Sequence, residues 1–362
     1  MSLFRQGNVF RFGEEVKSYW QRQKKYDVLI KGAGITGLSL AYWINQLRPS
    51  MTVAIYETES IGFGASGRNA GFLTCGSVSY FSQLRDKFGL DKASEIWNFH
   101  AKNHELMKQF VGSCDYENNG AITASSTKER TEKLREIMDA MKSCRIKVEE
   151  TSLQGFDGAF LYKGDGSVHP IKLLSSLKEK IKADFYFGKQ EVEGRIIFDA
   201  TNAYMNNSLV TAQRAQVLML APIARFLKTT VYHPESLTYF KQLPSGEVLI
   251  GGARTLDSKT EETKELGLNP KIQEYLENFL KSNFETLKDQ PVLTQWSGIM
   301  GFTPDHLPIA GSNALNSYFI GGYSGHGMGL AFHSSKKLVE HVFLKTELPW
   351  FLDAARFENK KY

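Results

Sequence analysis

Short apolar runs alternate with polar segments along the chain, and the spacing of the apolar positions predicts the elements. Residues 28–30 form an apolar run that ends in a glycine turn. Apolar residues then recur at Leu38, Ala41 and Leu47 with helical spacing. Residues 51–56 alternate and contain β-branched side chains, which is typical of a strand. The first part of the chain therefore predicts a strand, a turn, a helix and a second strand.

Similar patterns return along the rest of the chain. Alternation predicts strands and apolar positions three or four residues apart predict amphipathic helices. Near the C-terminus we expect a strand, a glycine-rich turn and a helix at 318–320, 321–327 and 328–342, and in the middle strands at 229–240 and 247–251 and helices at 129–142 and 270–287. Pro244, Ser245 and Gly246 form the expected turn between the two middle strands. The pattern indicates an α/β protein.

Composition places the chain among ordinary globular proteins. It has 362 residues, of which 42% are hydrophobic and 23% charged, so we expect about two domains and neither a disordered chain nor a disulfide miniprotein. A net charge of +5 is mildly basic and favours anionic small molecules over nucleic acid. Cys75, Cys114 and Cys144 form no C-x-x-C pair, which fits a reducing compartment and gives no zinc motif.

Neither a membrane helix nor a leader peptide is predicted. The longest apolar stretch, residues 217–227, is interrupted by Pro222 and Arg225 and falls short of the ~20 residues that span a bilayer. The first 20 residues carry charges throughout and lack a continuous apolar segment. We therefore expect a soluble, cytoplasmic protein with no membrane partner.

The strongest chemical signal lies in the first turn. Gly32, Gly34 and Gly37 form G-x-G-x-x-G between the predicted strand and helix, a spacing that lets the backbone approach a pyrophosphate at the helix start. The second strand ends in Glu57, ~20 residues past the glycines, where an acid accepts hydrogen bonds from a ribose diol. The order of these features predicts a dinucleotide site, and NAD and FAD both remain open.

The segment after the second strand decides between the two dinucleotides. Residues 61–76, IGFGASGRNAGFLTCG, are small apart from one arginine and one asparagine, so the backbone can follow an extended ligand. Here the chain resembles the FAD-dependent oxidoreductases of the D-amino-acid oxidase superfamily, in particular glycine oxidase, sarcosine oxidase and gamma-glutamylputrescine oxidase. Ser18-Tyr19-Trp20 resembles the N-terminal lead-in of the last branch. Further matches follow in order at 166–177, 196–204, 296–311 and 318–332, among which G-Y-S-G-H-G is the most specific.

The resemblance implies a fold and a set of cofactor contacts. It implies a Rossmann-like FAD-binding domain from residues 1–85, 167–213 and 295–362, interleaved with a smaller α+β substrate domain on an antiparallel sheet from 86–166 and 214–294. The helix that starts after the C-terminal glycine turn would face the flavin edge where negative charge collects on reduction. The expected FAD contacts are Gly32, Gly34, Ile35, Thr36, Gly37, Glu57, Thr58, Ala65, Ser66, Arg68, Asn69, Ala70, Gly71, Phe72, Thr201, Gly325, His326, Gly327 and Met328.

The chain departs from the family pattern at three places. Gly298 stands where sarcosine oxidases carry the cysteine that binds flavin covalently, so non-covalent FAD is expected. Met300 stands where glycine oxidase-like enzymes place an arginine for the substrate carboxylate, which puts a simple amino-acid substrate in doubt. Residues 171–198 are shorter than the family norm and lack a hairpin that helps to hold adenine, so weaker FAD binding or reduced turnover stays open.

Several side chains are candidates for the substrate side. Arg254 follows a predicted strand and is a candidate partner for a carboxylate, with a surface ion pair as the alternative. His326 and Tyr323 lie in the C-terminal glycine turn, where catalytic and purely structural roles both remain open. Tyr80 is a candidate for an aromatic wall beside the substrate. His100 and His104 are four residues apart on a predicted helix, but without a third ligand no metal site is predicted.

The expected function is oxidation of the C–N bond of an amine or amino-acid derivative, with hydride transfer to flavin N5 and an electron acceptor that is oxygen or unknown. One alternative is the flavin domain of a tRNA-modifying oxidoreductase, although no basic patch with interleaved aromatic residues supports nucleic-acid binding. The other is a flavin-binding module without small-molecule turnover.

Overall fold

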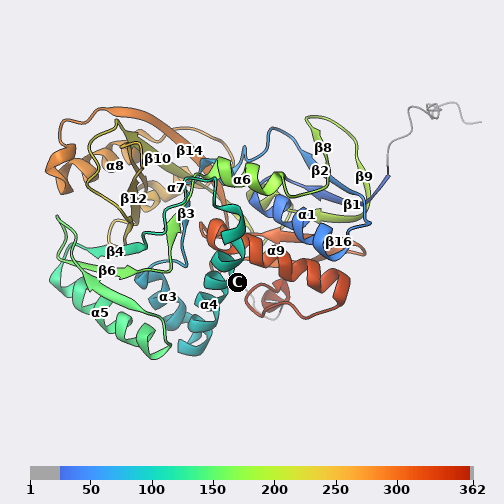
Figure 1. Cartoon of the computed structure of the whole chain (residues 1–362), viewed down its shortest axis with the longest axis horizontal. Coiled ribbons are helices and arrows are strands. Elements are labelled where there is room, and N and C mark those ends of the chain that lie inside the picture. The colour runs from blue at the N-terminus through green and yellow to red at the C-terminus, as the bar shows by residue number, and fades with distance from the viewer. Residues whose placement is uncertain (1–24, 359–362) are drawn as a thin grey trace, which may run out of the picture.

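The computed structural model describes residues 25–358, and Ser18-Tyr19-Trp20 lies outside them. The chain forms two large sheets that lie side by side (Figure 1). The six-stranded sheet has the order β15-β16-β9-β1-β2-β8, and all its neighbours are parallel except the β15–β16 pair. Its strands are β1 (Lys25–Lys31), β2 (Val53–Glu57), β8 (Asp184–Phe187), β9 (Glu193–Asp199), β15 (Ile309–Ala314) and β16 (Ser317–Gly321).

The eight-stranded sheet has the order β14-β10-β13-β12-β11-β4-β6-β5 and is antiparallel except where β11 meets β4. Its strands are β4 (Ala121–Ser125), β5 (Val148–Thr151), β6 (Gly158–Tyr162), β10 (Thr211–Leu220), β11 (Thr230–His233), β12 (Thr238–Gln242), β13 (Val248–Gly252) and β14 (Val292–Phe302). A small ladder of β3 (Phe72–Leu73) and β7 (Gly166–Ser167) forms a third sheet.

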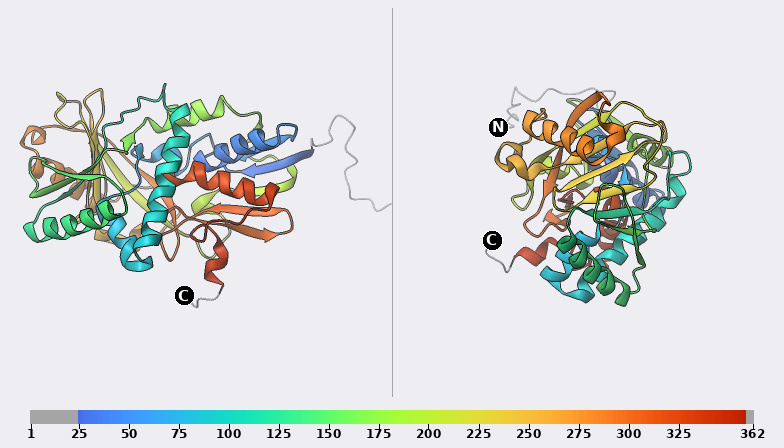
Figure 2. Two further views of the ribbon diagram at one scale, coloured as in Figure 1. Left: turned by 60° about the horizontal axis from the view of Figure 1, so that its bottom comes forward. Right: turned by 90° about the vertical axis from the view of Figure 1, so that its left-hand side faces the viewer.

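Helices cover both large sheets. Two helices that pack against each other come from near the two ends of the described chain. The helices are α1 (Ile35–Leu47), α2 (Ala65–Arg68), α3 (Val78–Phe88), α4 (Leu90–Met107), α5 (Lys128–Ser143), α6 (Pro170–Lys178), α7 (Ser258–Glu261), α8 (Pro270–Asn283) and α9 (Gly327–Leu344). Helix α1 packs on α9, and α4 crosses α9 between the two sheets (Figures 1 and 2). Trp43 lies between α1 and α9 and donates its indole N–H to the Phe332 carbonyl at 2.9 Å.

The mixed α/β fold class is confirmed, but two predicted elements were wrong in extent. The strand predicted over 229–240 breaks after His233, because Pro234 begins a turn in which Leu237 adopts a positive φ of 52°. Two antiparallel strands, β11 and β12, result. The helix predicted over 270–287 ends at Asn283, and a short 3-10 helix follows at Glu285–Leu287.

The division into two domains stays a prediction. The expected boundary at residue 295 falls inside β14, which pairs with β10 along the eight-stranded sheet. Among the helices of residues 25–358, none combines the length and apolar character that crossing a bilayer requires.

Candidate cofactor and substrate site

The glycine turn between β1 and α1 is closed by backbone contacts. Gly32 has a φ of +100°, and a Cβ there would lie 2.9 Å from the Ala200 carbonyl oxygen at the end of β9. A Cβ on Gly37 would lie 1.9 Å from the Gly32 carbonyl oxygen. A Cβ on Gly34 meets only the Ser66 hydroxyl, at 2.8 Å. Gly32 and Gly37 are therefore required by the turn itself, whereas Gly34 faces a movable side chain.

Glu57 ends β2 beside this turn. Its Oε2 accepts the Ala33 N–H at 2.9 Å, and its Oε1 accepts the Glu59 N–H at 3.2 Å and the Thr58 hydroxyl at 3.2 Å. On the other side of β1, Thr201 donates its N–H to Asp199 at 3.0 Å just beyond β9. The groups at the carboxyl ends of three neighbouring parallel strands thus surround one crevice, which is where ligands bind in sheets of this kind.

Helices α1 and α9 both begin without a side-chain cap. Their N-cap residues are Gly34 and His326, and neither makes a side-chain cap hydrogen bond within the described residues. Helices α3, α5, α6 and α8 all have such a cap, from Ser77, Thr127, His169 and Asn269, while α4, which starts after Gly89, does not. The first turn of a helix has N–H groups with no partner inside the helix. The Ser66 hydroxyl accepts one of them, the Ile35 N–H, so the remaining N–H groups at the starts of α1 and α9 offer donors to a ligand.

The two uncapped helix starts lie next to each other. The Thr36 hydroxyl in the first turn of α1 is 3.3 Å from the Tyr323 hydroxyl, which comes from the turn before α9. Tyr323 is buried, and burial raises its pKa above the ordinary value. Tyr323 is therefore a neutral phenol at this crevice. It connects the first turn of α1 with the turn before α9.

The small-residue segment runs from this crevice toward the eight-stranded sheet. Ser66 accepts the Ile35 N–H at 2.9 Å, and Asn69 accepts the Gly71 N–H at 2.7 Å. Gly71 has a φ of +72°, and a Cβ there would lie 2.0 Å from the Val168 carbonyl oxygen. Beyond it, Ala70 and Phe72 pack with Tyr239, Leu249 and Trp296 of the eight-stranded sheet. The segment containing Ala65 thus lies between the two sheets.

Arg68 is held by the protein rather than free. Its guanidinium lies 4.9 Å from the Phe63 ring centre and donates to the carbonyls of Phe63 at 2.8 Å and Ser297 at 3.3 Å. A Cβ on Gly298 would lie 3.1 Å from the Arg68 Cβ, so a cysteine there would crowd Arg68. A hollow of about 350 Å³ opens beside this arginine and is lined by Ser60, Ile61, Gly62, Phe63, Gly67, Arg68, Ile171 and Trp296.

Three rings meet at the start of α9. Tyr80 stacks on His326 with ring centres 4.2 Å apart, and His100 stands edge-on to both rings. Burial lowers the pKa of His326 to about 4, so the imidazole is neutral at pH 7. His326 can therefore donate or accept a hydrogen bond here but does not carry a positive charge. Gly325, Gly327 and Met328 surround it in the turn and first helical residues.

The eight-stranded sheet contributes Met300 near the start of α9 and Arg254 beside Phe302. Arg254 follows β13, is half-buried, and lies 4.3 Å from the Phe302 ring centre; no carboxylate among residues 25–358 forms an ion pair with it. Burial lowers the pKa of its guanidinium, and the largest opposing influence is Tyr239. The Met300 sulfur lies 3.8 Å from where a Cβ on Gly325 would stand.

Lys241 on β12 is a candidate that the sequence analysis missed. It is only 5% exposed, and its ammonium nitrogen lies 3.2 Å from where a Cβ on Gly71 would stand. It has no hydrogen-bond partner in the described part of the chain, and burial lowers its pKa to about 8, partly opposed by Glu117. The sequence does contain a sign of this position. Lys241 is two residues from Tyr239 and therefore lies on the same face of the strand.

These groups fit a dinucleotide that carries a flavin. Two helix starts supply N–H donors for the pyrophosphate and for the electron-rich edge of a ring, Glu57 supplies a ribose acceptor, and the segment through Gly71 supplies a backbone wall. Among the predicted contact residues, Gly32, Gly34 and Glu57 lie at the carboxyl ends of β1 and β2 and His326 lies at the start of α9. The Arg68 guanidinium is already bound by neighbouring carbonyls.

Comparison with known proteins gives the same assignment. The family model described as FAD dependent oxidoreductase matches residues 27–341. Gamma-glutamylputrescine oxidoreductase of Escherichia coli (strain K12) is 24% identical over 366 residues, which cover 87% of this chain and 83% of that protein. The structure of glycine oxidase from Geobacillus kaustophilus superposes with a TM-score of 0.76 at 19% identity over 93% of this chain and 99% of that one. L-proline dehydrogenase from P. horikoshii gives 0.75 at 17% identity, covering 93% and 99%. At these identities the two structures support the fold.

Proposed function

Because this chain belongs to the FAD-dependent oxidoreductase family, we propose that it oxidises the C–N bond of an amine or amino-acid derivative and that it holds FAD without a covalent bond. The observation that carries the proposal is the pair of uncapped helix starts, α1 and α9, joined by Thr36 and Tyr323 at one crevice. Among the relatives, gamma-glutamylputrescine oxidoreductase and glycine oxidase carry names that fit this reaction class.

Bound at this site, FAD would supply the acceptor for the hydride from the carbon next to nitrogen. The chain's own groups bind, orient and shield. Glu57 would bind the ribose hydroxyls, and the start of α9 would stabilise negative charge on the ring. Tyr80 and the neutral His326 exclude water from the reacting face. Lys241 adds a positive charge near Gly71 that favours the reduced state.

Arg254 is the group proposed for a substrate carboxylate. The arginine has no ion-pair partner in the described residues, and Met300 cannot bind an anion. A thioether near Gly325 instead favours an apolar substrate portion at that point. We therefore expect unmodified glycine to be a poor substrate.

The test has two stages. First, acid precipitation of the purified protein should release all yellow colour, and mass spectrometry should identify FAD; colour that stays on the polypeptide would contradict non-covalent binding. Second, flavin bleaching is followed anaerobically against a panel of amines and amino acids. Bleaching by an amine supports the proposal. No bleaching by any member, with bound FAD intact, favours a flavin module or a tRNA-modifying protein instead.

A further inference from the structure

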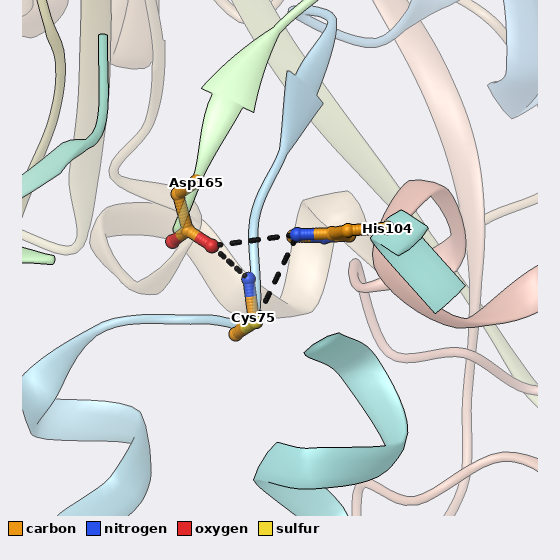
Figure 3. Close-up of side chains that lie close together, drawn as sticks. All are labelled: Cys75, His104 and Asp165. Atoms are coloured by element: carbon orange, nitrogen blue, oxygen red, sulfur yellow. Dashed lines mark hydrogen bonds and ion pairs between the residues drawn. The ribbon is translucent and has the colours of Figure 1, made fainter. Parts of the chain in front are cut away.

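Cys75, His104 and Asp165 converge in the interior although they lie far apart in the sequence. Cys75 follows β3, His104 is on α4 and Asp165 precedes β7 (Figure 3). The Nδ1 atom of His104 lies 3.8 Å from the Cys75 Sγ and 3.6 Å from the Asp165 Oδ1. All three are buried, with exposed fractions of 0%, 6% and 0%. The α4 histidine pair does not act together, because His100 turns toward Tyr80 and His326 instead.

The geometry does not suit nucleophilic catalysis. A Cys–His–Asp relay uses the two different nitrogens of the imidazole, one toward the nucleophile and one toward the acid. Here one nitrogen, Nδ1, faces both the thiol and the carboxyl group. Three donor atoms that surround a single point are the arrangement of a metal site.

The cluster also contains a polar atom that lacks a partner. The Asp165 Oδ1 accepts the Cys75 backbone N–H at 2.8 Å, but its Oδ2 is fully buried and makes no hydrogen bond within residues 25–358. A buried carboxyl oxygen without a partner destabilises the folded chain. A cation that both Asp165 carboxyl oxygens contact would remove that destabilisation.

We propose that Cys75, His104 and Asp165 bind one zinc ion. Ideal zinc bonds of about 2.3 Å to sulfur and 2.0–2.2 Å to nitrogen and oxygen separate tetrahedral ligand atoms by about 3.3–3.6 Å. The two separations from His104 Nδ1, 3.6 and 3.8 Å, need to contract by only a few tenths of an ångström, and all three ligand atoms lie within 4.8 Å of one another. The thiolate and imidazole favour zinc over magnesium or calcium. The thiol and carboxyl protons leave to solvent as the ion binds, and the second carboxyl oxygen of Asp165, Oδ2, completes the four ligand atoms.

Neighbouring groups support the three ligands. The Tyr162 side chain lies near Cys75, and the Cys75 N–H orients Asp165. Because the cluster is buried, the ion binds as the chain folds. It would tie the segment after β3, which follows the small-residue wall of the cofactor crevice, to α4 and β7. The site is therefore structural, and it is independent of the proposed reaction.

The test is metal analysis of untagged, FAD-loaded protein produced with zinc in the medium. We expect about one zinc per chain. The X-ray absorption fine structure of the zinc should show one sulfur neighbour at about 2.3 Å. Cys75→Ser and His104→Gln should each lose at least nine-tenths of the zinc. Cys114→Ser is the matched control, because Cys114 is also buried but its thiol donates to the Phe110 carbonyl. This variant should keep its zinc.

The proposal is overturned if wild-type protein contains less than about one-tenth zinc per chain both as purified and after refolding with zinc. It is also overturned if the wild-type absorption spectrum shows no sulfur neighbour, a result that does not depend on any variant folding. Flavin content and amine-driven bleaching are measured on the same samples, so loss of activity with full zinc separates a failed function from a failed metal site.

Discussion

The two large sheets contribute to the crevice in different ways. The six-stranded sheet supplies mainly backbone: glycines, two helix starts and one carboxylate at strand ends. The eight-stranded sheet supplies long side chains, Lys241 and Arg254, that have no ion pair or hydrogen bond of their own in the described residues. Backbone contacts suit a ligand that is the same throughout a family, such as a cofactor. Side chains without partners suit a ligand that differs between family members, such as a substrate. Cofactor binding and substrate choice are therefore expected to respond to different mutations.

The largest effect is expected on the six-stranded side, from Gly37→Ala. Its Cβ would stand 1.9 Å from the Gly32 carbonyl oxygen, so the turn cannot keep its shape and the cost exceeds the ~1–3 kcal/mol of ordinary overpacking. We expect little soluble, flavin-loaded protein. Gly34→Ala is the control, because its Cβ meets only the Ser66 hydroxyl. Thermal unfolding of the flavin-free proteins should separate the two; equal midpoints would disprove the account of the turn.

Glu57→Gln should weaken FAD binding without unfolding the protein. The amide keeps the size of the side chain but loses a charged acceptor for the ribose hydroxyls, worth about 1.5–3 kcal/mol, or roughly ten- to a hundredfold in the dissociation constant. The measurement is flavin fluorescence during titration of the flavin-free protein. Glu59→Gln serves as the control, since Glu59 contacts Glu57 only through its backbone N–H. An unchanged constant for Glu57→Gln would contradict the assigned adenosine position.

On the eight-stranded side, Arg254→Met should affect substrate and leave FAD bound. For a substrate with a carboxylate, we expect half-saturation of anaerobic flavin reduction to rise about tenfold or more, from a lost charge-assisted contact of about 1.5–3 kcal/mol. Amines without a carboxylate should change little. Equal half-saturation for the acidic substrate would remove Arg254 from this role.

The smallest effect is expected from Lys241→Met, as a change in pH dependence. The pKa of Lys241 is about 8, so its positive charge is present below pH 8 and is lost as the pH rises through that value. Reduction of the bound flavin should therefore become harder above pH 8 in the wild type, and this inflection should vanish in the variant. Potentials measured against a reference dye test this, with exposed Lys228→Met as control. An inflection that persists in Lys241→Met would place its origin elsewhere.

The difference between the two sheets also explains which features of the site could be predicted from the sequence. The glycine turn, Glu57 and the segment through Asn69 are encoded within about 40 residues, so local spacing was sufficient for the family, and that assignment is confirmed. Two other contacts could not be predicted from local patterns, because they join segments that are far apart in the sequence. They are the contact of Lys241 with the Gly71 region and that of Asp165 with Cys75. The break at Pro234 was missed because alternation continues across it.

The contact between Thr36 and Tyr323 has a consequence for biosynthesis. Ribosomes deliver domains from the N-terminus onward, but β1 pairs with the later strand β9, whose other neighbour is β16, and α1 packs on α9. Helix α1 therefore cannot complete its packing until the residues of α9 have emerged from the ribosome. Chains truncated before residue 344 should consequently be colourless, and yellow colour would report complete translation.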